Sequence, residues 1–365
     1  MTINRNRSGK RNLFYKLRRK SKLIVSALMA GILLLLAGCG SAGASGAAGS
    51  AGGQKETDIV KLGYFPNITH APALVGLEKG FFQTELGNGV KLDTKVFPNG
   101  SLFMDALSTG QIDIGYAGPE PVLSRYLQGG DVVVLSGVAT GGNVLVARKD
   151  SGIESIKDLE GKTVATPARG CTHDISLRIL MQAAGLKMQD QGGTVKQVTQ
   201  TPADMLTLFQ QKQLDAAVVS EPWASQMEAL VGAKVIVDAG QMPWQGNLPS
   251  TVLVSTKKFV QQNPEVVKKI LKGNVDAINF IQENPAEAAA LINQNLTQLT
   301  KKKLTPEVVQ KSLARTHITS DLDPQILADM EQKAQEFKLV QGNIDTKGLV
   351  DLTLLKQVLQ LKESR

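Results

Sequence analysis

The chain has 365 residues, of which 42% are hydrophobic and 20% are charged, so it is long enough to bury the cores of two domains. Its formal net charge is +8, but residues 1–38 contain nine of the 41 Lys and Arg residues and none of the 33 Asp and Glu residues. Residues 39–365 therefore carry 32 basic and 33 acidic residues, a formal charge of −1, which excludes nucleic acid as an expected partner.

The first 38 residues have the order of an export signal. A basic segment is followed by the apolar residues 23–37 and by small residues before Cys39. About fifteen apolar residues fall short of the roughly 20 that span a bilayer, which disfavours an uncleaved membrane anchor. The ending Leu36-Ala37-Gly38-Cys39 resembles a bacterial lipobox, in which the cysteine is acylated after cleavage. We expect residues 1–38 to be a lipoprotein signal peptide, and lipid on Cys39 to hold the mature chain on the outer face of the cell membrane or in the periplasm.

A tether is predicted next. Residues 40–53 are all Gly, Ala or Ser, which cannot bury enough apolar surface to fold. As a coil, such a segment of about 14 residues spans roughly 20 Å. We therefore assign residues 39–56 to the acylated cysteine and its tether. Cys171 is the one other cysteine, so no internal disulfide is expected.

After Asp58, short β-branched runs alternate with amphipathic segments. Residues 74–79 and 177–184 are predicted helices that end at Gly80 and Gly185, as helix C-termini often do. This alternation predicts parallel sheets with helices on both faces. The expected strands are 59–64, 90–97, 112–116, 132–138, 144–147, 163–166, 216–219, 235–237 and 252–255.

The last hundred residues are predicted to form a string of short helices. Four helix starts are expected where a side-chain acceptor at the N-cap precedes a proline at the first helical position. These pairs are Asn263-Pro264, Asn284-Pro285, Thr305-Pro306 and Asp323-Pro324.

Two stretches of the chain resemble each other at a nearly constant offset. Thr69-His70 returns as Thr172-His173 after 103 residues, and Glu120-Pro121 returns as Glu221-Pro222 after 101. Between them, Gln111-Ile112-Asp113 returns as Gln213-Leu214-Asp215 after 102. Before these, the expected strands 59–64 and 163–166 are followed by Pro66 and Pro167. Capped helices and turns make unrelated βα units look alike, but four matches in the same order favour two lobes of one design. Ligands of open α/β sheets bind at the carboxyl ends of the strands, so facing lobes would form a cleft there.

The motifs together resemble the solute-binding components of ABC importers for nitrate, taurine and aliphatic sulfonates. The resemblance covers Asp58 to about Val340 and is carried by the segments 62–64, 70–73, 78–82, 110–115, 157–162 and 221–223, which read LGY, HAPA, EKGFF, GQIDIG, KDLEGK and EPW. It implies an α/β, type II periplasmic-binding-protein fold: two βα lobes with a ligand cleft and two crossover strands, near residues 141–146 and 245–251. Lobe one would comprise residues 57–143 plus 247–365, and lobe two residues 144–246.

Five segments and Asn143 are expected to line the cleft. Thr69, Ser101 and Thr172 are predicted N-caps, whose hydroxyls and following backbone N–H groups would face the opening. Helix N-termini aimed at one point bind an anion, which suits a sulfonate. The candidate ligand-binding residues are Asn67, Thr69, His70, Asn99, Ser101, Gly118, Pro119, Glu120, Asn143, Arg169, Gly170, Cys171, Thr172, His173, Glu221 and Trp223.

The segment 170–173 is the strongest candidate. Gly170 permits close approach of the backbone, Thr172 offers a hydroxyl, and His173 could donate from its ring. The alternative is an ordinary capped helix whose histidine bonds a neighbouring carbonyl. Arg169 could supply a positive charge or lie on a solvated loop.

The two Glu-Pro glutamates complicate an anion site. Glu120 and Glu221 would repel an anion, so they either turn away and brace loops, which we favour, or accept a hydrogen bond from an amine of a zwitterion such as taurine. Trp223, Trp244, Tyr64 and Phe65 could form an apolar wall for the ligand's tail.

These observations favour a monomeric binding protein, without cofactor, metal or catalytic residue, that delivers a small organic anion to an ABC permease and its ATPase. An aliphatic sulfonate or taurine is the preferred ligand, with nitrate or a thiamine-precursor pyrimidine as alternatives. A cysteine-dependent enzyme using Cys171 is disfavoured, because residues i and i+2 of a helix diverge by about 200° and His173 would then face away. A metal receptor would have only His70, His173 and His317, without close ligand spacing.

Overall fold

The computed structural model of the protein describes residues 58–340 and 345–363. The predicted signal peptide, Cys39 and the tether lie outside the described residues and stay predictions. Within the described part, no helix combines the length and the hydropathy needed to cross a membrane.

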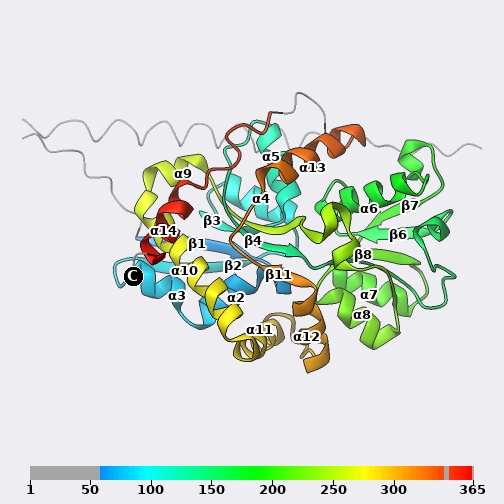
Figure 1. Ribbon diagram of the computed structural model, residues 1–365, viewed down its shortest axis with the longest axis horizontal. Helices are drawn as coiled ribbons and strands as arrows, with labels where there is room; N and C mark the ends of the chain where they lie inside the picture. The colour runs from blue at the N-terminus through cyan, green and yellow to red at the C-terminus, as the bar shows by residue number, and fades with distance from the viewer. Residues whose placement is uncertain (1–57, 341–344, 364–365) are drawn as a thin grey trace, which may run out of the picture. The chain divides into compact units, whose positions relative to one another are not determined.

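Two mixed sheets organise the chain (Figure 1). Their order is β11-β4-β10-β3-β1-β2 in the six-stranded sheet and β7-β6-β8-β5-β9 in the five-stranded sheet. The strands of the first are β1 (Ile59–Tyr64), β2 (Lys91–Val96), β3 (Ile114–Ala117), β4 (Val133–Gly141), β10 (Pro249–Ser255) and β11 (Thr316–Ile318). Those of the second are β5 (Asn143–Ala147), β6 (Thr163–Thr166), β7 (Lys196–Thr199), β8 (Ala216–Ser220) and β9 (Lys234–Val237).

All nine expected strands are present, with ends that differ by up to three residues. The sequence prediction missed β7, which is rich in polar residues, and β11, which has three residues. The expectation of parallel sheets was correct in part: β1 pairs in parallel with β2 and β3, as β6 does with β7 and β8. However, β10 and β5 run antiparallel to their neighbours, because each follows a direct connection from the other sheet rather than a helical crossover.

The internal repeat predicted from the sequence is confirmed. Leu62 of β1 aligns with Ile114 of β3, and Val164 of β6 aligns with Ala216 of β8, so both residues of the pair are displaced by 102 positions. The repeated aspartates act alike as well. Asp113 Oδ2 accepts from the backbone N–H of Lys61 at 2.8 Å, and Asp215 Oδ2 accepts from Thr163 at 2.9 Å.

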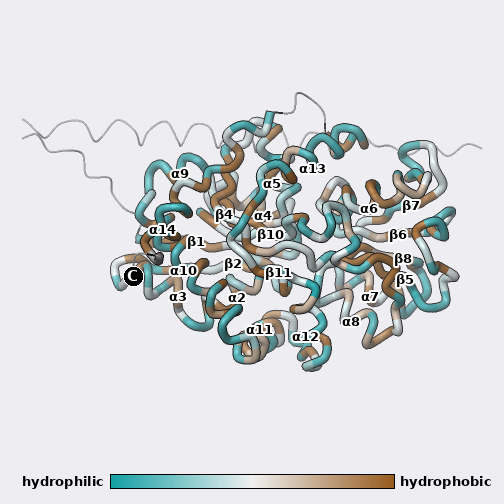
Figure 2. The backbone as a smooth tube through the Cα atoms, in the orientation of Figure 1, coloured by the Kyte–Doolittle hydropathy of each residue, from teal (hydrophilic) through white to brown (hydrophobic). Residues whose placement is uncertain are grey.

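Helices cover both faces of the sheets, as expected. Neighbouring strand residues enter opposite hydrophobic clusters: Val144 and Val146 enter one, and Leu145 and Ala147 another. Figure 2 shows hydrophobic residues concentrated along β5 and β8, whose residues are all buried. The helices before the C-terminal region are α2 (Ala71–Glu78), α3 (Phe81–Leu86), α4 (Gly100–Ser108), α5 (Pro119–Leu127), α6 (Thr172–Ala183), α7 (Pro202–Gln210), α8 (Trp223–Val231) and α9 (Lys257–Gln262), with short 3₁₀ turns η1 (Ile68–His70), η2 (Ile156–Leu159), η3 (Gln189–Gln191), η4 (Ala239–Gln241) and η5 (Pro243–Gly246).

The C-terminal region is helical, but it is not a string of short helices. Four helices start at the predicted prolines, and two of them are long, with 20 residues in α10 and 16 in α11. The length of α10 follows from its apolar face, which packs against α2, α3, α11 and α14. The helices are α10 (Pro264–Glu283), α11 (Pro285–Thr300), α12 (Pro306–Ala314), α13 (Pro324–Glu336) and α14 (Thr353–Glu363).

All four predicted residues are the N-caps of their helices, but the expected side-chain hydrogen bond forms at two of them. Thr305 Oγ1 accepts from Val308 N–H, and Asp323 Oδ1 accepts from Gln325 N–H. Asn263 and Asn284 instead donate from their amides to the carbonyls of Phe259 and Phe280, each at 3.3 Å. These two asparagines therefore satisfy the end of the preceding helix, because only one residue separates it from the next.

The chain passes between the sheets at two places. It leaves β4 through Gly141 and Gly142, both with φ near +70°, and enters β5; it returns through η5 to β10. Positive φ favours glycine, and a Cβ on Gly142 would lie 2.7 Å from Thr316 Oγ1. A residue larger than glycine is therefore disfavoured at Gly142, both by the backbone conformation and by the lack of space for its side chain.

Candidate functional site

A cavity of about 270 Å³ lies at the carboxyl ends of strands from both sheets. The first sheet contributes residues that follow β1, β2 and β3, and the second contributes residues that follow β6 and β7 and the last residue of β8. The lining comprises Phe65, Asn67, Pro98, Asn99, Gly100, Ser101, Met104, Gly118, Glu120, Pro121, Ser124, Arg125, Gln128, Pro167, Ala168, Arg169, Gly170, Cys171, Thr172, His173, Pro202, Ser220, Ser250 and Leu339.

The structure brings most of the predicted site residues to this cavity. Those on its wall are Asn67, Asn99, Ser101, Gly118, Glu120, Arg169, Gly170, Cys171, Thr172 and His173. Those that do not line it are Thr69, His70, Pro119, Asn143, Glu221 and Trp223.

Helix starts face the cavity, but the predicted N-caps were wrong. Asn99 caps α4, with Oδ1 accepting from Leu102 N–H at 3.0 Å, and Ser101 follows it inside the helix. Cys171 is the N-cap of α6, and Thr172 is its first helical residue. Thr69 lies inside η1. The asparagine amide is a better acceptor at α4 than the serine two positions on, because only the N-cap residue has the extended backbone.

A chain of hydrogen bonds starts at the N-cap of α6. Ser220 Oγ donates to Asn143 Oδ1 at 2.8 Å, so its one proton is used and it accepts from His173 Nε2 at 2.8 Å. His173 Nδ1 then faces Cys171 Sγ at 3.8 Å. Both ring nitrogens are therefore engaged, and the predicted ring donor is directed at Ser220 rather than at a ligand.

The expectation that Cys171 and His173 face away from each other was wrong. Cys171 has extended backbone angles, φ −77° and ψ 167°, so the helical spacing does not apply to this pair. Nevertheless, burial raises the pKa of the Cys171 thiol to about 12, and burial lowers the pKa of His173 to about 4. The pair is a neutral thiol beside a neutral imidazole, which lacks the thiolate of a cysteine nucleophile.

Two buried polar groups on opposite walls have no partner in the described part of the chain. Thr172 Oγ1 makes no hydrogen bond and lies 3.6 Å from the position of a Cβ on Gly118. Glu120, which is 6% exposed, forms no hydrogen bond or ion pair there. Burial, followed by the charges of Glu331 and Asp174, raises the pKa of Glu120 well above its ordinary value.

The cations of the wall are already paired. Arg125 Nη2 lies 2.5 Å from Asp105 Oδ1, and Arg169 pairs with Asp190. Arg178 belongs to α6, is 2% exposed, and bonds Asp174 and both oxygens of Asp190. Asp174 in turn accepts from the N–H of Gly170 at 2.7 Å, so this network fixes the loop that begins α6.

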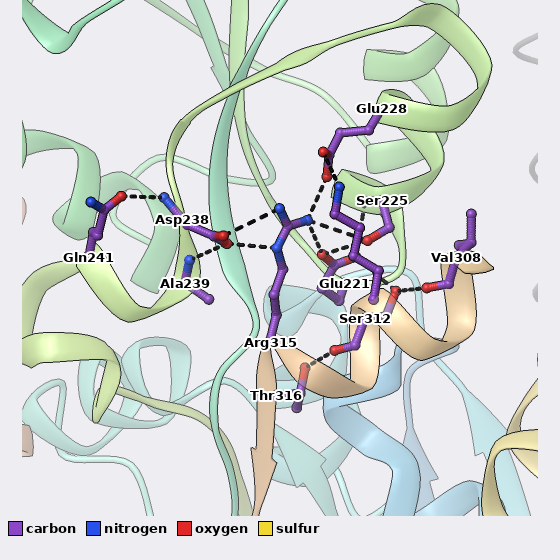
Figure 3. Close-up of polar contacts among 11 residues, drawn as sticks. Glu221, Ser225, Glu228, Asp238, Ala239, Gln241, Val308, Ser312, Arg315 and Thr316 are labelled. Atoms are coloured by element: carbon purple, nitrogen blue, oxygen red, sulfur yellow. Dashed lines mark hydrogen bonds and ion pairs between the residues drawn. The ribbon is translucent and has the colours of Figure 1, made fainter. Parts of the chain in front are cut away.

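Glu221 does not line the cavity and has the bracing arrangement that we favoured for both glutamates, whereas Glu120 makes no such contact within the described residues (Figure 3). Its carboxylate accepts from Ser225 and Ser312 and lies 2.9 Å from Arg315 Nη1. Arg315 also pairs with Glu228 and Asp238, each at 2.6 Å. The arginine follows α12, whereas its acidic partners lie at β8, α8 and η4, so the network connects the C-terminal region to the second sheet.

His70 and three of the four predicted wall aromatics lie outside the cavity lining. His70 stacks on Phe65 at 4.6 Å, and its Nδ1 accepts from Phe65 N–H at 3.4 Å. Among the four predicted wall aromatics, Phe65 alone lines the cavity. Tyr64 and Trp223 are buried in hydrophobic clusters, and Trp244 packs against one.

Sequence reasoning missed several lining residues. Ser220 ends β8 directly before Glu221, so the rule that ligands meet strand ends could have found it. Ser250 on the antiparallel β10 and Leu339 beyond α13 are brought to the cavity by tertiary packing, and no sequence signal marks them. The described residues contain no group of three or more His, Cys, Asp or Glu positioned to hold a metal ion.

Known proteins are similar to this chain in sequence and in architecture. Over 348 residues the chain is 28% identical to a Bacillus subtilis protein named for aliphatic sulfonate binding, covering 93% of this chain and 97% of the relative. It is 30% identical over 239 residues to the taurine-binding periplasmic protein of Escherichia coli, covering 65% and 71%.

The fold agrees with the sequence expectation. The alkanesulfonate-binding protein SsuA from Xanthomonas axonopodis pv. citri, solved with MOPS bound, superposes with a TM-score of 0.71 at 19% identity, covering 81% of this chain and 99% of that one. This likeness shows the periplasmic-binding-protein fold. Residues 53–295 match the NMT1-like family, and the chain therefore belongs to that family.

Proposed function

We propose that the protein is the extracytoplasmic substrate-binding lipoprotein of an ABC importer and captures a small organic anion. The observation that carries the proposal is the cavity between the two sheets, whose wall contains the starts of α4, α5 and α6. Backbone N–H groups at helix starts stabilise negative charge without a fully charged partner. A sulfonate, whose oxygens accept hydrogen bonds from several directions, fits such a set of donors.

Capture would occur by closure of two lobes. Residues 57–143 plus 247–365 would form one lobe and residues 144–246 the other, hinged at the two connections between the sheets. The ligand would draw the starts of α5 and α6 together, and a permease with its ATPase would recognise the closed form of the monomer. Lipid on Cys39 would keep the protein at the outer face of the membrane or in the periplasm.

An aliphatic sulfonate or taurine is our preferred ligand, because both relatives are named for such compounds. Nitrate and a thiamine-precursor pyrimidine are the alternative ligands, and the transport role of the protein would be the same with either. A hydrolytic function through Cys171 is disfavoured by its neutral thiol.

The test is calorimetry and thermal denaturation of the full-length chain in detergent with pentanesulfonate, taurine, nitrate and an aminopyrimidine. We expect saturable binding of a sulfonate with a rise in the melting temperature. Failure of all four compounds to bind would refute the proposal. Hydrolysis of an activated ester that is lost in Cys171→Ser would instead establish the enzyme alternative.

A further inference from the structure

An anion site normally avoids a carboxylate, yet Glu120 is part of this cavity wall. It is the second residue of α5, and its Oε1 lies 3.9 Å from the position of a Cβ on Gly170, at the start of α6. The two arginines of the wall, Arg125 and Arg169, are paired with Asp105 and Asp190. No cation among the described residues pairs with Glu120.

The groups around Glu120 are mainly acidic or neutral. From α6, Asp174 is compensated by Arg178, while Cys171 and His173 are neutral. From α4, Asp105 is compensated by Arg125 of α5 itself. The strands β4 and β10 carry no titratable side chain.

The remaining neighbour comes from α13, which packs against both α5 and α6. Glu331 on this helix is 2% exposed and forms no ion pair in the described part of the chain. A second buried carboxyl therefore stands behind the first, and the two disfavour simultaneous ionisation.

We propose that Glu120 binds the ligand as a neutral carboxylic acid, donating its O–H to an oxygen of the anion. This inference rests on the proposed function and adds a requirement to it. A carboxylic acid is a hydrogen-bond donor, whereas a carboxylate only accepts. Together with the Thr172 hydroxyl, it forms a pair of uncharged donors at the start of α6.

The proton balance makes the inference measurable. Above the pKa of Glu120 in the free protein, each bound anion takes up one proton from solvent, and no covalent bond changes. The affinity for a permanent anion is then constant at low pH and falls about tenfold per pH unit above that pKa.

The experiment is calorimetric titration of the full-length chain with pentanesulfonate from pH 5 to pH 9. Sulfonate-free buffers of different ionisation enthalpy report the protons exchanged on binding. We expect uptake of one proton per ligand at high pH. Glu120→Gln should bind with nearly the wild-type affinity at low pH, lose the pH dependence and exchange no proton.

Two further variants test the origin of the effect. Glu331→Gln removes the buried neighbour, whose charge raises the pKa of Glu120. In this variant the pKa of Glu120 should fall, so the onset of the affinity loss should move to lower pH. Glu307→Gln, an exposed change on α12, should leave the curve unchanged. An onset moving upward contradicts the proposal.

Other outcomes would overturn it directly. Affinity that rises with pH, together with loss of binding in Glu120→Gln and preference for taurine over pentanesulfonate, would mean that a carboxylate pairs with an ammonium group. If no anion binds, the transport proposal fails separately, and carbon-13 NMR of the free protein, assigned with Glu120→Gln, decides the carboxyl's state. Titration of Glu120 at its ordinary value would then refute the neutral acid.

Discussion

At the scale of single residues, two glutamates from equivalent positions of the repeat have opposite environments. Glu120 lines the cavity and has no partner among residues 58–340 and 345–363, whereas Glu221 is fully buried and paired with Arg315. The sequence motif Glu-Pro is the same in both halves, so the motif alone could not separate these roles. The difference arises from Arg315, which lies 94 residues further along the chain than Glu221.

Loss of Arg315 should destabilise the protein strongly. Arg315→Ala leaves Glu221 buried without a cation, and breaking a buried pair typically costs about 3–5 kcal/mol. We expect a decrease of about 3 kcal/mol in the free energy of unfolding, measured by chemical denaturation. Lys234→Ala, which removes an exposed pair with Glu154, is the control and should cost less than about 1 kcal/mol. Equal effects of the two variants would contradict this.

The hydroxyl of Thr172 should serve binding at a cost to stability. Thr172→Val keeps the size but removes a buried, unpartnered hydroxyl, so the free energy of unfolding should stay constant or rise. The affinity for pentanesulfonate should fall about tenfold, since a hydrogen bond to a charged group contributes about 1.5–3 kcal/mol. Calorimetry and denaturation measure the two effects. Thr207→Val, on the exposed face of α7, is the matched control and should change neither.

At the scale of elements, the close approach of β1 and β3 depends on glycine. A Cβ on Gly115 would lie 2.3 Å from Gly63 O and 2.8 Å from Gly63 N, and neither backbone atom can move without displacing a strand. The segments that follow these strands carry Asn67 and Glu120, so the spacing of the strands also sets one wall of the cavity.

Gly115→Ala should therefore reduce stability. Overpacking typically costs about 1–3 kcal/mol, and backbone neighbours place this site at the upper end. Gly89→Ala, where no atom lies within 4 Å of the added Cβ, should change stability by less than about 0.5 kcal/mol. Thermal denaturation of both variants checks this, and an unchanged melting temperature for Gly115→Ala would exclude the steric argument.

Some elements could be predicted from the sequence and others could not. Strand positions, the proline-initiated helices and the repeat follow from local patterns, and they located most of the cavity wall. The N-cap errors at Ser101 and Thr172 arose because neighbouring residues of similar chemistry compete for one position. The path of α13 was beyond local reasoning, since its contacts with α5 and α6 depend on tertiary packing (Figure 1).

At the scale of the whole molecule, Glu331 should make stability depend on pH. Burial raises its pKa to about 7, above the ordinary value of 4.5. The folded state therefore favours the protonated form, and this contribution is complete below about pH 4.5 and is lost as pH rises through 7.

Glu331→Gln should remove that loss. The free energy of unfolding of the variant, relative to wild type, should rise between pH 5 and pH 8 by up to about 3 kcal/mol. Urea denaturation at both pH values measures the difference. A relative stability that does not change with pH would show that Glu331 ionises normally in the folded protein.

The outer strand β2 has a consequence for the protein in a crowded solution. It ends the six-stranded sheet and exposes Lys91, Asp93 and Lys95, while the three other outer strands have three or four residues each. Charged or very short borders offer a poor template for a strand from another copy. Such edge strands oppose fibril growth and edge-to-edge pairing between copies of the chain.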